Sequence, residues 1–199
     1  MITDESMTTK QRIMTAALET VREEGIVGTS ARAIAARGGF NQALIFYHFG
    51  TVGHLLMEAA ADSSARQVDR YRAAASESAT LTGLVEIARR LHHDDQRSGS
   101  VTVVTQLMAA SVSDPEMGKA VLAGFQGWIG LVEEALDRAL SGSPLATVIP
   151  TRQAAYAIAA VFLGIELMER LDPSQSEAAQ VFDAMASLAG LFENLLQGS

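Results

Sequence analysis

The sequence contains no cysteine, which excludes a disulfide framework and a thiolate metal site. No apolar run reaches the roughly 18 residues that a membrane-spanning helix needs. The longest candidate, residues 154–168, is interrupted by Glu166. The first ten residues, MITDESMTTK, are polar and lack the apolar core of a signal peptide. We therefore expect a soluble, cytoplasmic protein with no membrane partner.

Basic residues are also few, because 15 Lys and Arg stand against 23 Asp and Glu and the formal net charge is −8. Such a balance argues against a non-specific coat on nucleic acid, although a local basic surface can still bind DNA. Hydrophobic residues make up 48% of the 199 residues. The chain is therefore not disordered and is long enough to bury a substantial core.

Acidic residues are absent from one window, which lies between Gly25 and Met57. Arg32 and Arg37 are the only residues in that window with a full charge, and His48 and His54 are titratable. An acid-free segment within an acidic chain indicates a surface that meets phosphate.

The same window contains the signals of two short helices. It reads TSARAIAARGGFNQALIFYHFGTVGHLL over residues 29–56. Ser30 is a predicted N-cap, and Gly38-Gly39 supply the left-handed conformation that ends a helix. Asn41 and Thr51 are predicted to cap the next two helices. Two short helices joined by a glycine turn predict a helix-turn-helix, whose second helix can enter the DNA major groove.

These residues stand in a fixed register that resembles the DNA-binding domain of the tetracycline-repressor (TetR) family. The resemblance is carried by Gly25, Thr29-Ser30, Arg32, Ile34-Ala35, Gly39-Phe40-Asn41, Ile45-Phe46-Tyr47-His48-Phe49 and Leu55-Leu56. One position departs, since Val52 stands where the family often carries a lysine that contacts a DNA phosphate. The resemblance implies a helix-turn-helix domain over residues 1–53 and a helical ligand-binding and dimerisation domain over residues 54–199.

The second helix of the motif supplies the candidates for reading bases. Gln42 can pair with an adenine edge, and Ala43 and Leu44 can touch thymine methyl groups. For Leu44, the alternative is that it fills the edge of the core. Tyr47 and His48 are better placed for phosphates, as the resemblance also implies, and a packing role is the alternative for His48.

The first helix of the motif supplies candidates for phosphate contacts. Thr29 and Ser30 can cap the helix and meet a phosphate at the same time. Arg32 can reach a base edge or a phosphate, and a solvated surface arginine is the alternative. The complete predicted DNA-binding set is Thr29, Ser30, Arg32, Asn41, Gln42, Ala43, Leu44, Tyr47 and His48.

The whole chain is predicted to be all-α, because no alternating strand pattern extends far enough to indicate a sheet. Ile13, Ala17 and Val21 form a stripe on a first helix that ends at Gly25 and covers the two short helices. The later helices are predicted over residues 52–75, 80–93, 101–112, 115–140 and 151–171, and from Ser174 or Ser176 to Gln197.

The last two predicted helices are unusually apolar. The final one carries a seam for a partner helix, and the one before it is apolar on more than one side, so it needs two neighbours. A monomeric core is one solution, and a four-helix contact between two subunits, which the resemblance implies, is the other. The predicted dimer-interface residues are Phe162, Ile165, Met168, Val181, Met185, Leu188 and Phe192. Twofold symmetry would place two recognition helices on one DNA face, about 34–36 Å apart or more, to read a palindrome.

The resemblance also implies a ligand pocket among the middle helices. The predicted ligand-binding residues are Tyr71, Leu91, Thr105, Gln106, Met108, Phe125 and Trp128. Gln106 lies in a largely apolar helix and needs a partner if buried, which could be a ligand. Glu166 is expected to pair with Arg170 at i+4 or with a charge across the subunit seam. A mostly apolar pocket favours a hydrophobic or amphipathic effector.

No constellation indicates an enzyme, a cofactor or a metal site. The cluster His92-His93-Asp94-Asp95 does not place its two histidines on one helical face, and the charged end of a helix is the simpler interpretation. We therefore expect a ligand-responsive dimeric regulator, a repressor that a small molecule releases from a palindromic operator. The alternative is a helical small-molecule sensor or carrier whose DNA binding has weakened, as Val52 allows.

Overall fold

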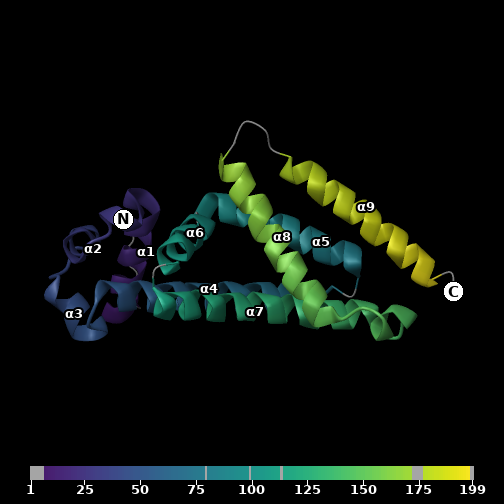
Figure 1. Cartoon of the computed structure of the whole chain (residues 1–199), viewed down its shortest axis with the longest axis horizontal. Coiled ribbons are helices and arrows are strands. Elements are labelled where there is room, and N and C mark those ends of the chain that lie inside the picture. Colours follow the sequence, from purple (N-terminus) through teal and green to yellow (C-terminus); the bar gives the residue numbers. More distant parts are fainter. Residues whose placement is uncertain (1–6, 79, 99, 113, 172–176, 198–199) are drawn as a thin grey trace. The chain divides into compact units, whose positions relative to one another are not determined.

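The computed structural model describes residues 7–78, 80–98, 100–112, 114–171 and 177–197. Within these ranges all regular structure is helical, and the predicted all-α class is confirmed (Figure 1). The helices are α1 (Thr9–Gly28), α2 (Ala31–Gly38), α3 (Ala43–Phe49), α4 (Val52–Ser76), α5 (Leu81–Ser98), α6 (Ser100–Ser111), α7 (Pro115–Leu140), the short 3-10 helix η1 (Pro144–Thr147), α8 (Thr151–Leu171) and α9 (Ala178–Gln197). Among the described residues, every helix is too short or too polar to traverse a bilayer.

The helices pack into two compact units. The first consists of Met1–Ser64 and Thr102–Gly124, and the second of Ala65–Val101 and Phe125–Ser199. α6 and the start of α7 therefore pack with the N-terminal helices rather than with the C-terminal ones. α4 and α7 contribute residues to both units. The domain boundary between residues 53 and 54 stays a prediction.

The first unit is built around the stripe that the sequence predicts on α1. Ile13, Ala17 and Val21 are fully buried and share one core with residues of α2 and α3. These partners include Ile34, Ile45 and Phe49, while Phe40 packs at the edge of the core. Val103 and Leu107 of α6 and Met117 of α7 belong to the same cluster. Each such large side chain contributes about 1.5–3 kcal/mol when it leaves water.

α1 differs from the sequence-based prediction at its C-terminal end. The helix was expected to end at Gly25, and the backbone does leave the helical region there, with φ 74° and ψ 170°. A glycine tolerates this left-handed φ because it has no Cβ. The chain then returns to helix and continues to Gly28. At the other end, Thr8 caps the helix, since its side chain and that of Gln11 bond reciprocally to each other's backbone N–H.

In the second unit, α4 and α7 run parallel and side by side (Figure 1). Arg72 of α4 reaches Glu134, with Nε and Oε2 3.4 Å apart, and Arg138 of α7 donates to the carbonyl of Ala75 at 3.2 Å. α9 packs along α5, where Phe182 is buried. Thr82 of α5 donates its backbone N–H to Glu193 of α9 at 2.7 Å.

α5 is longer than predicted, because it runs to Ser98 rather than ending at His93. The reason is tertiary, since His92 and Asp95 are buried and held by α8. α9 begins at Ala178. The predicted starting positions Ser174 and Ser176 lie outside the described residues.

Candidate functional site

The recognition helix α3 has a buried side and an exposed side. Ile45 and Phe49 are buried in the core, as predicted from their spacing of four. Ala43, Phe46 and Tyr47 point away from it, and Tyr47 is 82% exposed. Because residues on a helix repeat every 3.6 positions, these three side chains share one outward face. This face is the candidate surface for reading DNA bases.

The start of α3 leaves the predicted base-reading residue available. Asn41 accepts a hydrogen bond from the backbone N–H of Ala43 at 2.9 Å, so it acts as the predicted cap. Gln42, the residue directly before α3, is exposed and makes no capping hydrogen bond with its side chain. Its amide group can therefore present a donor and an acceptor to a base edge.

Two predicted DNA-binding residues lie at the rim of the recognition surface. Leu44 is partly buried and packs against the core, which fits the alternative that it fills the core edge. His48 is also partly buried, and its ring meets that of Tyr47 edge-on with centroids 5.0 Å apart. Both residues therefore support the recognition surface from its side.

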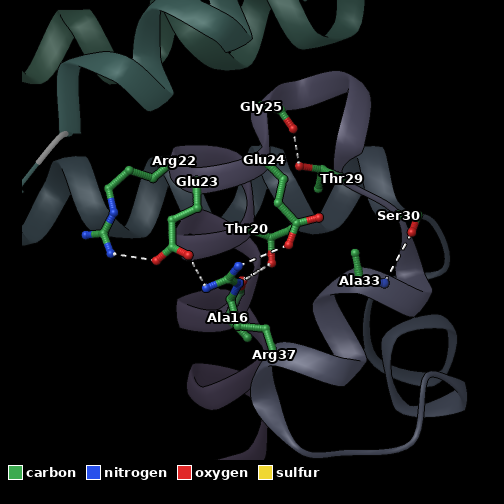
Figure 2. Close-up of polar contacts among 10 residues, drawn as sticks. All are labelled: Ala16, Thr20, Arg22, Glu23, Glu24, Gly25, Thr29, Ser30, Ala33 and Arg37. Atoms are coloured by element: carbon green, nitrogen blue, oxygen red, sulfur yellow. Dashed lines mark hydrogen bonds and ion pairs between the residues drawn. The ribbon is translucent and has the colours of Figure 1, made fainter.

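The start of α2 is a set of hydrogen bonds that orients the predicted phosphate-binding residues (Figure 2). Ser30 accepts from the backbone N–H of Ala33 at 3.2 Å, which confirms its capping role. Thr29 instead donates its hydroxyl hydrogen to the carbonyl of Gly25 at 2.7 Å. Since Ser30 uses its oxygen as an acceptor in this bond, its hydroxyl hydrogen remains for a phosphate. Ser30 is therefore the better phosphate donor of the two.

The two arginines of the acid-free window have different surroundings. Arg37 donates to Glu23 at 2.7 Å, to Glu24 at 3.0 Å and to the hydroxyl of Thr20 at 3.2 Å (Figure 2). Its hydrogen bond to Glu23 lowers the pKa of that carboxyl group, and the hydrogen bonds that the guanidinium donates to Glu24 and Glu23 raise its own pKa. Arg37 therefore holds α1 to α2.

Arg32, in contrast, is exposed. Its side chain has no hydrogen bond or ion pair with any of the described residues. Arg32 is therefore the arginine of the window that no described residue pairs with, and its contact with DNA stays a prediction.

Phe46 is the residue that sequence reasoning missed. It lies on the exposed side of α3 and is 51% exposed, although the prediction left it out of the DNA-binding set. Its position could have been found from the buried pair Ile45 and Phe49, since a residue one step from Ile45 points about 100° away. An exposed phenylalanine beside Gln42 and Ala43 is suited to contact with a thymine methyl group.

The first turn of α4 carries no lysine, and the structure shows what replaces it. Val52 is partly buried and packs against the core of the first unit. Thr51 accepts from the backbone N–H of His54 at 3.0 Å, which confirms the predicted cap. The side chain at position 52 therefore contributes packing here and no charge.

The predicted ligand-binding residues fall into both compact units. Thr105, Gln106 and Met108 lie on α6 in the first unit, while Tyr71, Leu91, Phe125 and Trp128 lie in the second. The hydroxyl of Thr105 is buried and has no hydrogen-bond partner among the described residues. Gln106 does have a partner, since its Oε1 accepts from the backbone N–H of Ile26 at 2.6 Å.

In the second unit the aromatic candidates pack against each other. The rings of Tyr71 and Trp128 lie with centroids 6.0 Å apart, in one cluster with Val68 and Ile87. The hydroxyl of Tyr71 donates to Asp94 at 2.7 Å. Burial raises the pKa of Tyr71, and the hydrogen bond to Asp94 raises it further. Tyr71 therefore stays neutral and presents an apolar ring with one polar edge.

Large apolar side chains on α8 and α9 are exposed to solvent. They include three of the predicted interface residues, Met168, Leu188 and Phe192. The other predicted interface residues, Phe162, Ile165, Val181 and Met185, are partly buried. Further exposed apolar residues on the same two helices are Tyr156, Val161, Leu167, Leu171 and Leu191. An apolar surface of this kind is typical of a protein interface.

Glu166 has a different partner from the one predicted. Arg170 bonds to Asp95 at 3.1 Å, and its charge lowers the pKa of Glu166. Glu166 contacts His92 of α5 within the same chain. The interpretation of residues 92–95 as the charged end of a helix is also corrected, because α5 continues to Ser98 and both His92 and Asp95 are buried. The described residues contain no group of three or more His, Asp or Glu side chains placed to hold a metal ion.

Comparison with known proteins adds a family match over the helices that form this site. Residues 13–59 match the family model described as bacterial regulatory proteins, tetR family. The curated HTH-type transcriptional repressor AcnR of Corynebacterium efficiens is 26% identical over 113 residues, which cover 57% of this chain and 56% of the relative. The chain thus matches little more than half of that relative's length.

Solved structures resemble the fold over most of the chain. The fatty acid degradation regulator FadR from Bacillus halodurans has a TM-score of 0.77 and 17% identity, over 93% of this chain and 96% of that chain. FadR from Bacillus subtilis, solved in complex with stearoyl-CoA, has a TM-score of 0.73 and 16% identity, over 89% and 96%. At these identities the likeness concerns the fold.

Proposed function

We propose that this chain, which belongs to the TetR family through its residues 13–59, is a dimeric transcriptional repressor that a small molecule releases from a palindromic DNA operator. The observation that carries the proposal is the two-sided recognition helix. Ile45 and Phe49 anchor α3 in the core, while Gln42, Ala43 and Tyr47 remain exposed and lie in the sequence window that has no acidic residue.

The chemistry of DNA binding divides between two helices. On α3, Gln42 matches the donor and acceptor of an adenine edge, and Phe46 with Ala43 suits the methyl group of thymine. On α2, Ser30, the first backbone N–H groups and Arg32 suit phosphate oxygens. Phosphate contacts position the protein and make its affinity depend on salt, while base contacts select the sequence.

Dimerisation is supported by the exposed apolar side chains of α8 and α9. A second copy of the chain would cover Met168, Leu188 and Phe192. A twofold dimer presents the same patch from both subunits, and it places two copies of α3 on successive major grooves. The operator would then be a near-palindrome.

The effector is proposed to be largely apolar with one polar group. Among the candidate positions of the second unit, Leu91, Phe125 and Trp128 are largely apolar, while the hydroxyl of Tyr71 is one polar group beside them. A compound with a long acyl chain is the first to test, because FadR from Bacillus subtilis is solved with stearoyl-CoA. Effector binding would favour a dimer geometry that does not fit the operator, which is a population shift.

The test is selection of bound duplexes from a random DNA pool, followed by the affinity of the winning duplex across a salt series. A palindrome that binds far more tightly than its scrambled version supports a repressor. Acyl compounds are then titrated into the protein, and their binding is monitored by the fluorescence of Trp128. A compound that binds and lowers the affinity for the palindrome is the effector. A folded dimer that binds a ligand but enriches no duplex contradicts the proposal and favours a sensor or carrier.

A further inference from the structure

α1 is kinked at Gly25, and the kink is joined to a distant helix. In a regular helix each backbone N–H bonds to the carbonyl group four residues earlier. After a break in the helix, the next N–H groups lose these acceptors. The backbone N–H of Ile26, the first residue after the break, donates to Oε1 of Gln106 at 2.6 Å. Donor and acceptor are 80 residues apart in the sequence. The side-chain oxygen of Gln106 on α6 is thus the hydrogen-bond acceptor for a backbone N–H of α1.

The local geometry fits this contact from both sides. A Cβ at position 25 would lie 3.5 Å from Oε1 of Gln106, and the positive φ of Gly25 disfavours any other residue. On α6, the neighbours Val103 and Leu107 are buried in the core that also holds α1, α2 and α3. Gln106 is therefore fixed in place by packing on either side of it along α6.

Beyond the kink, the chain leads directly to the predicted phosphate-binding residues. Thr29 bonds back to the carbonyl of Gly25 at 2.7 Å, and Ser30 caps α2 (Figure 2). The preceding turn of α1 is held to α2 by Glu23 and Glu24 through Arg37. The short segment from Gly25 to Ser30 is thus stabilised by its own hydrogen bond between Thr29 and Gly25. The hydrogen bond from Ile26 to Gln106 attaches this segment to α6.

We propose that Gln106 is a positioning residue for operator binding. Its side-chain oxygen holds Ile26, and through Ile26 it holds Ser30 and the first N–H groups of α2 where they meet DNA phosphates. The proposal rests on the proposed function. It also gives α6 a role in release, because Thr105, with its unpartnered hydroxyl, is the next residue along the helix. A ligand that bonds to Thr105 and turns or shifts α6 would move Gln106 with it.

The test compares Gln106→Leu, which removes the acceptor at similar volume, with Gln106→Glu, which keeps an oxygen for the Ile26 N–H. Ala109→Ser, at an exposed position of the same helix, is the control. Two quantities are measured on the full chain without effector: hydrogen exchange of the Ile26 amide by NMR, and affinity for the palindrome selected from the random pool. Urea unfolding midpoints show whether each variant remains folded.

We expect Gln106→Leu to raise the exchange rate of the Ile26 amide about tenfold and to lower the affinity for the palindrome about tenfold, since a partly buried donor loses its partner. Gln106→Glu should restore both, and Ala109→Ser should change neither. By linkage, the duplex should slow Ile26 exchange in the wild type more than in Gln106→Leu.

Three results would contradict the positioning role. Unchanged exchange at Ile26 in Gln106→Leu would mean that the hydrogen bond does not hold this amide. Faster exchange with unchanged DNA affinity would mean that the bond serves only local packing, while the proposed function stands. A wild-type protein that enriches no duplex would overturn the proposed function, and with it the role of Gln106 on an operator.

Discussion

Oε1 of Glu166 lies 2.5 Å from Nδ1 of His92, and the two residues are only 2% and 5% exposed. The contact joins α8 to α5, and the other ring nitrogen of His92 lies 2.8 Å from Glu169. Burial raises the pKa of Glu166 above its ordinary value of 4.5, although the hydrogen bond from His92 acts in the opposite direction. The folded protein therefore opposes ionisation of this carboxyl group.

The first prediction concerns the pH dependence of stability. A carboxyl group whose pKa is raised on folding stabilises the fold below its unfolded pKa, and this contribution is lost as pH rises through the folded value. Glu166→Gln keeps the shape and removes the ionisation. The unfolding free energy of the wild type should therefore fall relative to that of Glu166→Gln as the pH rises from 4.5 upward.

The measurement is urea unfolding of both proteins between pH 4 and pH 8, followed by circular dichroism. Glu177→Gln, at an exposed position before α9, is the matched control and should follow the wild-type curve. Parallel curves for the wild type and Glu166→Gln would show that the Glu166 carboxyl group does not oppose ionisation.

The second prediction separates the two arginines of the acid-free window. Arg37→Ala should lower the thermal midpoint by a few degrees, because it removes the bonds to Glu23 and Glu24. Since Arg37 lowers the pKa of Glu23, this stabilisation is present above the ordinary carboxyl pKa and is lost as the pH falls through the lowered value. The midpoint difference between wild type and Arg37→Ala should therefore shrink in acid.

Arg32→Ala should leave the thermal midpoint unchanged and reduce the slope of log affinity against log salt by about one, as expected for one lost phosphate contact. The salt series with the selected duplex measures this slope. A larger change of slope in Arg37→Ala than in Arg32→Ala would reverse the assignment of the two residues.

The local parts of this structure could be predicted from the sequence. Ser30 and Thr51 cap their helices as expected, because a cap depends only on residues two or three positions away. The stripe of Ile13, Ala17 and Val21 is buried because a period of nearly four gives one helical face. The same local register carries the resemblance to the TetR family, which the match over residues 13–59 confirms.

The long-range polar contacts could not be predicted. The sequence indicates that Gln106 and Glu166 need partners, since each interrupts an apolar helix. It does not say which partner, because Ile26 and His92 are 80 and 74 residues away and only the packed helices bring them near. Local spacing predicted Arg170 as the partner of Glu166. In the folded chain Glu166 instead contacts His92, because α5 packs close to α8.

The third prediction tests the outward face of α3. Phe46→Ala should lower affinity most for operators with thymine at the contacted position, by roughly tenfold, as a lost base contact of about 1–3 kcal/mol implies. Gln42→Ala should relax the preference for one base pair. Tyr47→Phe should lower the affinity for all DNA sequences by the same factor, because a phosphate contact carries no sequence information.

Competition between the selected duplex and single-base variants measures these effects. Ala36→Ser, at an exposed position of α2, is a control for substitution near the site. The assignment of roles is wrong if Phe46→Ala and Tyr47→Phe lower the affinity for the selected duplex and for random DNA by the same factor.

The fourth prediction concerns the exposed apolar residues of α8 and α9. Leu188→Asp should shift the protein from dimer to monomer, because a second copy would have to bury an unpaired carboxylate at that position. Leu122→Asp is the matched control, since Leu122 lies on α7 and is 61% exposed, close to the 56% of Leu188. Sedimentation velocity over a range of concentrations measures the dimer dissociation constant of both variants.

The dimer prediction also constrains DNA binding. A monomer engages one half-site at a time, so it loses the gain in effective concentration that links the two half-sites of a palindrome. Leu188→Asp should therefore bind the full palindrome little better than a single half-site, while Leu122→Asp keeps the wild-type difference. If Leu188→Asp remains a dimer with wild-type affinity, the exposed apolar face of α8 and α9 does not form the interface, and the two recognition helices must be paired through another surface.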